Sequence, residues 1–184
     1  LTQNSANTSK SQYRFLSAFL FESSYPLKKD NENYDDYLTP VLQLRYSPNK
    51  TKDLRDSDRR IDINNIYSFD RIGSSSTVEG GQSVTLGSGY RRTDKNDNQL
   101  LGLDLATVFR DEINENIPTS SSLGNKSSDV VGHIKIAPNN FFNTSYNFAV
   151  DNNVDQFKYH DITAKFQVNN FVTSFKYVEE RGNI

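Results

Sequence analysis

Hydrophobic and polar residues alternate with a period of two along most of this chain. The clearest run places apolar side chains at Phe142, Tyr146, Phe148 and Val150, and polar ones at Asn143, Ser145, Asn147 and Asp151. Successive side chains of a β-strand point to opposite faces of the sheet. The alternation therefore predicts strands that each carry one apolar and one polar face.

The same pattern recurs elsewhere in the chain, which predicts about eight strands in all. The other apolar positions are Tyr13, Phe15, Phe19 and Phe21 within 12–22; Leu38, Leu42, Leu44 and Tyr46 within 37–46; Val84, Leu86 and Tyr90; Leu101, Leu103, Leu105 and Phe109; Val130, Ile134 and Ile136; Ile162, Ala164, Phe166 and Val168; and Phe171, Phe175 and Tyr177. Most runs are about 9–11 residues long, the length that a tilted strand needs to cross a membrane. Strands of soluble proteins are usually shorter, about 5–6 residues.

The polar connections between the runs differ in length in a regular way. They fall at 24–36, 47–81, 93–98, 111–128, 138–140, 152–156 and 169–170. The two longest are the second and the fourth, so an antiparallel meander places both at the same end of the sheet. Asn139-Asn140 and Asn169-Asn170 predict tight turns at the other end, because Asn tolerates a positive φ. Outer-membrane barrels show this asymmetry, with long external loops and short periplasmic turns.

Together these features predict an all-β protein, an antiparallel up-and-down meander that forms part of a large transmembrane β-barrel. We expect residues 1–184 to be a single partial barrel domain cut from a longer protein, with a flexible segment at 1–11 and long external loops at 47–81 and 111–128. A β-sandwich also alternates, with its polar face toward bulk water. Alternation alone does not distinguish the two architectures.

The composition fits a barrel wall. Only 34% of the residues are hydrophobic, yet 12% are aromatic, with 10 Tyr and 12 Phe. A barrel with a wet interior has this composition because each strand needs only one apolar face. A loop-rich soluble β-domain is the other class that it fits.

Several other classes of protein are disfavoured. The chain has no Cys, which excludes disulfides and thiolate metal sites within it, and its net charge of −2 provides no basic surface for nucleic acid. No apolar stretch is long enough for a transmembrane helix.

The sequence gives little support for an enzyme, a cofactor or a metal site. His133 and His160 are the only histidines, and neither has a second metal-type ligand nearby in sequence. The stretch 94–98 resembles the start of a calcium loop, but Gln99 stands where that loop needs Gly, so it reads as a polar turn. Gly87-Ser88-Gly89 lacks the third glycine of a dinucleotide fingerprint. Small residues at such a place in a strand leave space or permit bending.

Three stretches carry a resemblance to a known family. The first is FESSYPL at 21–27 followed by YLTPVLQL at 37–44 and YSP at 46–48; the second is NIYSFDR at 65–71, with EGG at 79–81 leading into a strand that ends GYR at 89–91; the third is SDVVG at 128–132, followed by Pro138, Tyr146, Phe148 and Asp151. Their order and spacing over residues 15–180 resemble the LptD family, the outer-membrane lipopolysaccharide-assembly proteins of Gram-negative bacteria.

The resemblance points to Asp70, Arg71, Glu79 and Gly80 as a family-like loop. The stretch between Arg71 and Glu79 departs from the family pattern because it is rich in Ser, where the family often has a further Asp-Arg pair. The family's disulfide cysteines also have no counterpart here.

The resemblance implies a non-enzymatic role in the cell outer membrane of a Gram-negative bacterium. Lipopolysaccharide would arrive over a periplasmic bridge protein, enter the barrel and leave sideways into the outer leaflet, while a plug lipoprotein (LptE-like) occupies the lumen. This chain would supply barrel wall.

Strand parity then predicts which side chains face lipid and which face the lumen. Lipid-facing positions would be Leu101, Leu103 and Leu105. Polar lumen-facing candidates would be Asp104, His133, Lys135, Asn143, Ser145 and Asn147.

Two other functions fit the same pattern of residues. One is a passive porin-like uptake barrel, and the other is a secreted sugar-binding β-sandwich. The sandwich would fold alone as a soluble unit, whereas a barrel slice has two unpaired edges and would not be stable by itself.

Overall fold

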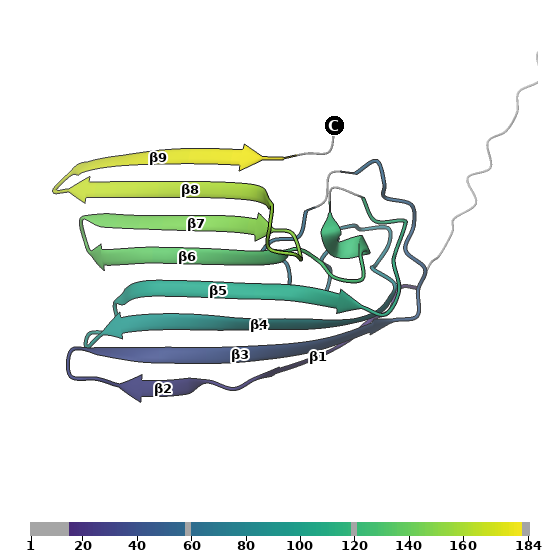
Figure 1. Cartoon of the computed structure of the whole chain (residues 1–184), viewed down its shortest axis with the longest axis horizontal. Coiled ribbons are helices and arrows are strands. Elements are labelled where there is room, and N and C mark those ends of the chain that lie inside the picture. Colours follow the sequence, from purple (N-terminus) through teal and green to yellow (C-terminus); the bar gives the residue numbers. More distant parts are fainter. Residues whose placement is uncertain (1–14, 58–59, 119–120, 182–184) are drawn as a thin grey trace, which may run out of the picture.

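The computed structural model describes residues 15–57, 60–118 and 121–181. They form one antiparallel sheet of nine strands that follow one another in chain order, with β2 beside β1 on the edge of β3 (Figure 1). The elements are β1 (Phe19–Ser24), β2 (Leu27–Asp30), β3 (Tyr34–Ser47), β4 (Gly81–Asp94), β5 (Gln99–Arg110), the short 3-10 helix η1 (Ser122–Gly124), β6 (Val130–Asn139), β7 (Phe142–Val150), β8 (Phe157–Val168) and β9 (Phe171–Glu180). The predicted all-β antiparallel meander is confirmed.

The beginning of the sheet differs from the prediction. A strand over 12–22 was expected, but residues 15–18 are not in a strand, and the expected connection 24–36 contains β2. Both β1 and β2 pair with β3. Pro26 interrupts the ladder between them because it has no N–H to donate. The link from β2 to β3 is a short turn, closed by the hydrogen bond from the Asn31 N–H to the Tyr34 carbonyl oxygen at 3.0 Å, so the connection expected at 24–36 is not one long loop. The expected flexible segment, 1–11, lies outside the described residues.

The short turns gather at one end of the sheet and the long loops at the other (Figure 1). Asn169 has a φ of 53°, as expected for Asn in a tight turn. The 94–98 stretch is the predicted polar turn, in which an Asp94 carboxylate oxygen accepts the N–H groups of Asn96 and Asn98 at 2.8 and 2.9 Å.

The sheet has one face packed against the loops, which we call the covered face, and an opposite bare face. Gln43, Thr85 and Val108 are buried on the covered face, and they are cross-strand partners in register. The bare face carries large hydrophobic side chains that are 36–67% exposed. They are Phe19, Phe21, Leu38, Leu42, Leu44, Tyr46, Leu86, Leu105, Phe109, Ile136, Ile162, Phe166, Phe171, Phe175 and Tyr177.

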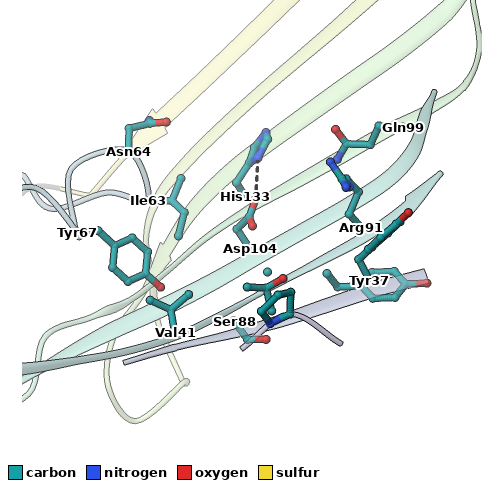
Figure 2. A pocket seen from close by; sticks show the side chains of 14 residues that line it. Tyr37, Val41, Ile63, Asn64, Tyr67, Ser88, Arg91, Gln99, Asp104 and His133 are labelled. Atoms are coloured by element: carbon teal, nitrogen blue, oxygen red, sulfur yellow. Dashed lines mark ion pairs between the residues drawn. The ribbon is translucent and has the colours of Figure 1, made fainter. Parts of the chain in front are cut away.

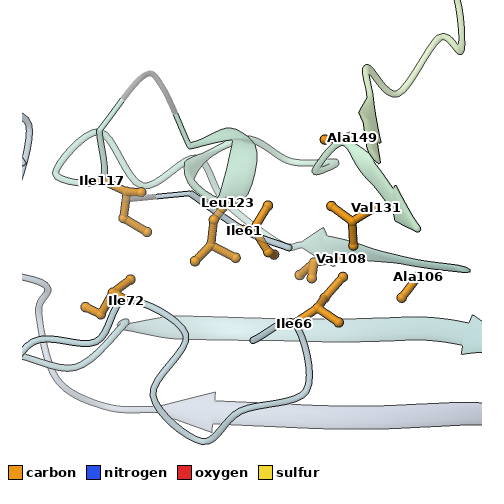
Figure 3. Close-up of a cluster of buried hydrophobic side chains, with 9 residues drawn as sticks. All are labelled: Ile61, Ile66, Ile72, Ala106, Val108, Ile117, Leu123, Val131 and Ala149. Atoms are coloured by element: carbon orange, nitrogen blue, oxygen red, sulfur yellow. The ribbon is translucent and has the colours of Figure 1, made fainter. Parts of the chain in front are cut away.

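The hydrophobic core lies between the loops and the covered face, not between two sheets (Figure 3). Its members come from the 48–80 loop, the 111–129 loop and the central strands. They are Ile61, Ile66, Ile72, Ala106, Val108, Ile117, Leu123, Val131 and Ala149. The loops therefore bury their own apolar side chains on the sheet.

No helix among the described residues has the length and apolar character to span a membrane.

Candidate functional site

The 48–80 loop is held to the covered face by a buried ionic cluster. Its centre is the Glu79 carboxylate, which receives two hydrogen bonds from Arg71 of the same loop, at 2.8 Å from Nε and 2.7 Å from Nη2. Both side chains are fully buried. Such a two-point contact between guanidinium and carboxylate is stronger and more directional than a single hydrogen bond.

Two arginines from the strands complete this Glu79 cluster. Arg110, the last residue of β5, donates from Nη1 to the Glu79 carboxylate and from Nη2 to the Gly80 carbonyl oxygen, the latter at 2.5 Å. Arg45 of β3 donates to the Glu79 carbonyl oxygen at 2.7 Å. Arg71 also reaches β4, where it donates to Ser83 at 2.7 Å and Thr85 at 3.2 Å. The cluster thus joins the loop to β3, β4 and β5.

One carboxylate serves all three guanidinium groups of the cluster. Arg45 Nη2 and Arg110 Nε are buried without a hydrogen-bond partner among the described residues. Buried cations of this kind depend strongly on their shared anion, because removing it leaves charge in a medium that solvates it poorly. Glu79 is therefore the residue on which the anchor depends.

The four family-like residues do not all belong to this anchor. Arg71, Glu79 and Gly80 do. Gly80 lets the backbone of Asn49 pack directly against it, since a Cβ at Gly80 would lie 2.0 Å from the Asn49 carbonyl oxygen. Asp70 instead accepts the N–H of Gly73 at 3.0 Å. Arg45 was not predicted, although it stands at a polar position between Leu44 and Tyr46.

A second charged contact ties the same loop to the far edge of the sheet. The Arg60 guanidinium lies 4.5 Å from the centre of the Tyr159 ring in β8. It also pairs with Glu180 of β9. The 48–80 loop is therefore tied to β3, β4 and β5 through the Glu79 cluster, and to β8 and the edge strand β9 through Arg60.

Exchanging the charges of this second contact will separate its role from that of the buried anchor. Arg60→Glu should loosen the loop by only about 0.2–1 kcal/mol, because the pair is partly exposed. Glu180→Arg should restore it in the double variant. Proteolysis of the 48–80 loop in the full-length protein, at low and high salt, measures the effect. A double variant no more resistant than Arg60→Glu alone would contradict the pairing.

A pocket of about 630 Å³ lies on the covered face beside this loop. Figure 2 shows Tyr67 and Ile63 of the loop on one side and the strand residues Asp104 and His133 on another. The Asp104 carboxylate lies 3.6 Å from His133 Nδ1. Burial raises the pKa of Tyr67 to about 12, so its hydroxyl stays protonated at any physiological pH.

The six polar candidates share the covered face but do not form one site. Register places Asp104 opposite His133 on β6, and His133 opposite Asn147 on β7. Lys135 is opposite Ser145. Lys135 and Asn143 line a separate hollow at the turn end of the sheet. Only Asp104 and His133 line the pocket beside the loop.

Charged and aromatic side chains also gather at the turn end of β3 and β4. The Asp36 carboxylate accepts hydrogen bonds from Arg92 at 2.8 Å and from Tyr90 at 2.7 Å. The Arg92 guanidinium lies 4.0 Å from the centre of the Tyr34 ring. Rings and charges of this kind suit the polar boundary of a membrane.

No group of three or more His, Cys, Asp or Glu side chains among the described residues could hold a metal ion.

Comparison with known proteins identifies the family. The sequence matches the model of LptD, described as LPS transport system D, over residues 1–184. No curated protein matches it significantly. The family consists of outer-membrane proteins of Gram-negative bacteria that act in lipopolysaccharide transport and assembly, and it is not an enzyme family. Because the match covers the whole chain, this protein belongs to the LptD family of lipopolysaccharide transport proteins.

Proposed function

We propose that this chain forms part of the wall of an outer-membrane barrel that inserts lipopolysaccharide into the outer leaflet. The bare face would contact the acyl chains of the membrane, and the covered face would line the lumen. The long loops would close the external end of the wall. The observation that carries the proposal is the contrast between the two faces of the same strands.

The bare face supports contact with lipid. Its hydrophobic side chains run over every strand from β1 to β9, although those of β7 are only half-buried rather than exposed. Among them, Leu42, Leu86 and Leu105 are 36–46% exposed near the middle of their strands. Soluble monomers rarely expose a continuous apolar surface larger than a few hundred Å². A secreted sugar-binding β-sandwich would have to cover this face with a second sheet.

The covered face supports a polar lumen. It presents Asp104, His133, Lys135, Ser145 and Asn147, which lie in register across neighbouring strands. In a barrel these groups would meet water, lipopolysaccharide or a plug lipoprotein of the LptE type. Lipopolysaccharide would reach the lumen from a periplasmic bridge protein of the same pathway.

The loops argue against a passive porin-like uptake barrel. The core beneath them is dry and apolar, and Ile66 and Val108 in it are 0% exposed. The 48–80 loop is also anchored to the central strand β5 and to the edge strand β9. Loops that are anchored to the inner surface of a barrel wall occupy part of the lumen. They leave a narrower channel for solutes than a wall without such loops.

Depletion of the full-length protein from its own bacterium tests the proposal. Newly made lipopolysaccharide should fail to reach the cell surface, while other outer-membrane proteins still assemble. Surface labelling of lipopolysaccharide after depletion measures this, with re-expression of the intact protein as the control. Normal surface lipopolysaccharide combined with reduced uptake of small solutes would favour the porin and overturn the proposal.

A further inference from the structure

Three glycines lie in or next to the pocket beside the 48–80 loop: Gly89 lines it, and Gly87 and Gly102 lie on the same two strands nearby. A Cβ at Gly89 of β4 would lie 2.8 Å from an Asp104 carboxylate oxygen, and one at Gly102 of β5 would lie 2.2 Å from the Gln99 amide nitrogen. At Gly87 a Cβ would lie 1.7 Å from the Tyr67 hydroxyl oxygen. The missing side chains leave room for polar groups of Tyr67, Asp104 and Gln99 to lie close to the sheet at the pocket.

The pocket is lined by Arg91, an exposed residue whose charge no carboxylate among the described residues neutralises. The Arg91 guanidinium lies 4.7 Å from the centre of the Tyr37 ring, which fixes it by a cation–π contact. Within the described part of the chain, Arg91 makes no hydrogen bond or ion pair, and the nearby Asp104 pairs with His133 instead. Its N–H groups are therefore available to an anion, for which the guanidinium fork is well shaped.

The rest of the lining consists of hydrogen-bonding groups and aromatic rings. Gln99, Asn64 and Thr39 add amide and hydroxyl groups. The rings of Tyr37 and Tyr67 stand at the edges, as Figure 2 shows. Flat apolar surfaces beside many donors and acceptors fit a sugar ring, which has both C–H faces and hydroxyl edges. An acyl chain would leave these polar groups without partners, which is costly.

We infer that this pocket binds a sugar that carries an anionic substituent, with Arg91 taking the anionic group. The inference rests on the proposed function, since it places the charged saccharide part of the cargo, rather than its acyl chains, against this stretch of wall. The pocket volume of about 630 Å³ lies within the usual range for small-ligand sites. Phosphate and carboxylate substituents share the chemistry that Arg91 would recognise.

Photo-crosslinking in living cells tests the inference. A photoreactive residue replaces Gln99 in the full-length protein, and Leu103 of the same strand provides the matched control. A β-bulge pairs Gln99 with Thr93, which places Gln99 on the covered face and in the pocket, whereas Leu103 lies on the bare face. We expect a lipopolysaccharide adduct at position 99 and none at 103. Arg91→Gln should lower the adduct yield by about tenfold, the loss expected for a charged hydrogen-bonding partner, and Arg91→Lys should lower it less. A strain whose saccharide lacks anionic groups should lose the adduct, and restoring phosphate or carboxylate separately identifies the substituent.

Three results would overturn the inference while leaving the proposed function intact, provided that depletion still blocks surface lipopolysaccharide. One is an adduct at position 99 with a protein only, which would assign the pocket to the plug lipoprotein. Another is an adduct whose yield does not change in Arg91→Gln. The third is no adduct at position 99 in cells that transport lipopolysaccharide normally. Loss of the transport phenotype itself in the depletion experiment would instead overturn the proposed function.

Discussion

Replacing Glu79 with glutamine will release the 48–80 loop from the sheet. The substitution keeps the shape of the side chain but removes the carboxylate that pairs with Arg45, Arg71 and Arg110, and no other carboxylate of the described residues does so. These three arginine side chains are at most 2% exposed. Removing one partner of a buried ion pair costs about 3–5 kcal/mol. The fraction of molecules with the loop open should therefore rise by about a hundredfold or more.

Protease added outside intact cells measures this release, because the loop ends would lie at the external side of the barrel. Glu79→Gln should be cut within the 48–80 loop far faster than the parent protein, while its level in the outer membrane stays high enough to detect. Glu115→Gln provides the control, since Glu115 is exposed in the neighbouring long loop. If both variants resist the protease as well as the parent does, the Glu79 cluster is not the anchor described above.

Replacing Gly87 with alanine will displace the loop at a second place. A Cβ at this position would lie 1.7 Å from the Tyr67 hydroxyl oxygen and 2.7 Å from the Leu105 carbonyl oxygen. The backbone of β5 cannot move away without disturbing the sheet, so Tyr67 has to leave its place over β4. Overpacking of this kind usually costs about 1–3 kcal/mol. Tyr67 is also held by its own carbonyl oxygen, which accepts a hydrogen bond from Gln43 at 2.8 Å, so its displacement should disturb that contact.

Two further variants make the Gly87 result specific. Gly102→Ala should be tolerated, because its Cβ would clash only with the flexible end of the Gln99 side chain and would lie at an ordinary contact distance of 3.7 Å from the Lys135 Cβ. Tyr67→Phe removes the clashing hydroxyl and should recover part of the loss in the Gly87→Ala background. The same protease assay measures all of them. A Gly102→Ala variant that is cut as fast as Gly87→Ala would mean that added bulk anywhere on the covered face loosens the loop, and that Tyr67 has no special role.

The period-two pattern predicted the architecture well because it reports a local property of the chain. Leu42, Leu44 and Tyr46 share a face whatever their strand pairs with, since side chains in a strand alternate strictly. Asn169 indicated its turn for an equally local reason, its tolerance of a positive φ. The family resemblance also came from short stretches whose order is visible in the sequence, and the family match bears it out.

The contacts that make the site were beyond this kind of reasoning. Glu79 meets Arg110 and Arg45, which lie 31 and 34 residues away along the chain. No periodicity connects such positions, and each arginine by itself looks like an ordinary polar-face residue. The break between β1 and β2 was missed for a different reason. Pro26 stops the ladder, yet both halves still pair with β3, so the interruption depends on a partner strand.

The sequence by itself determined that the chain forms amphipathic antiparallel strands with long loops at one end, and to which family it belongs. Only the tertiary structure decided what the loops do. The 48–80 loop packs Ile61, Ile66 and Ile72 against the sheet, and Glu79 neutralises arginines from two strands. Local alternation specifies the faces of a strand, but burial of charge is decided by groups that are far apart in the chain and meet only once it has folded.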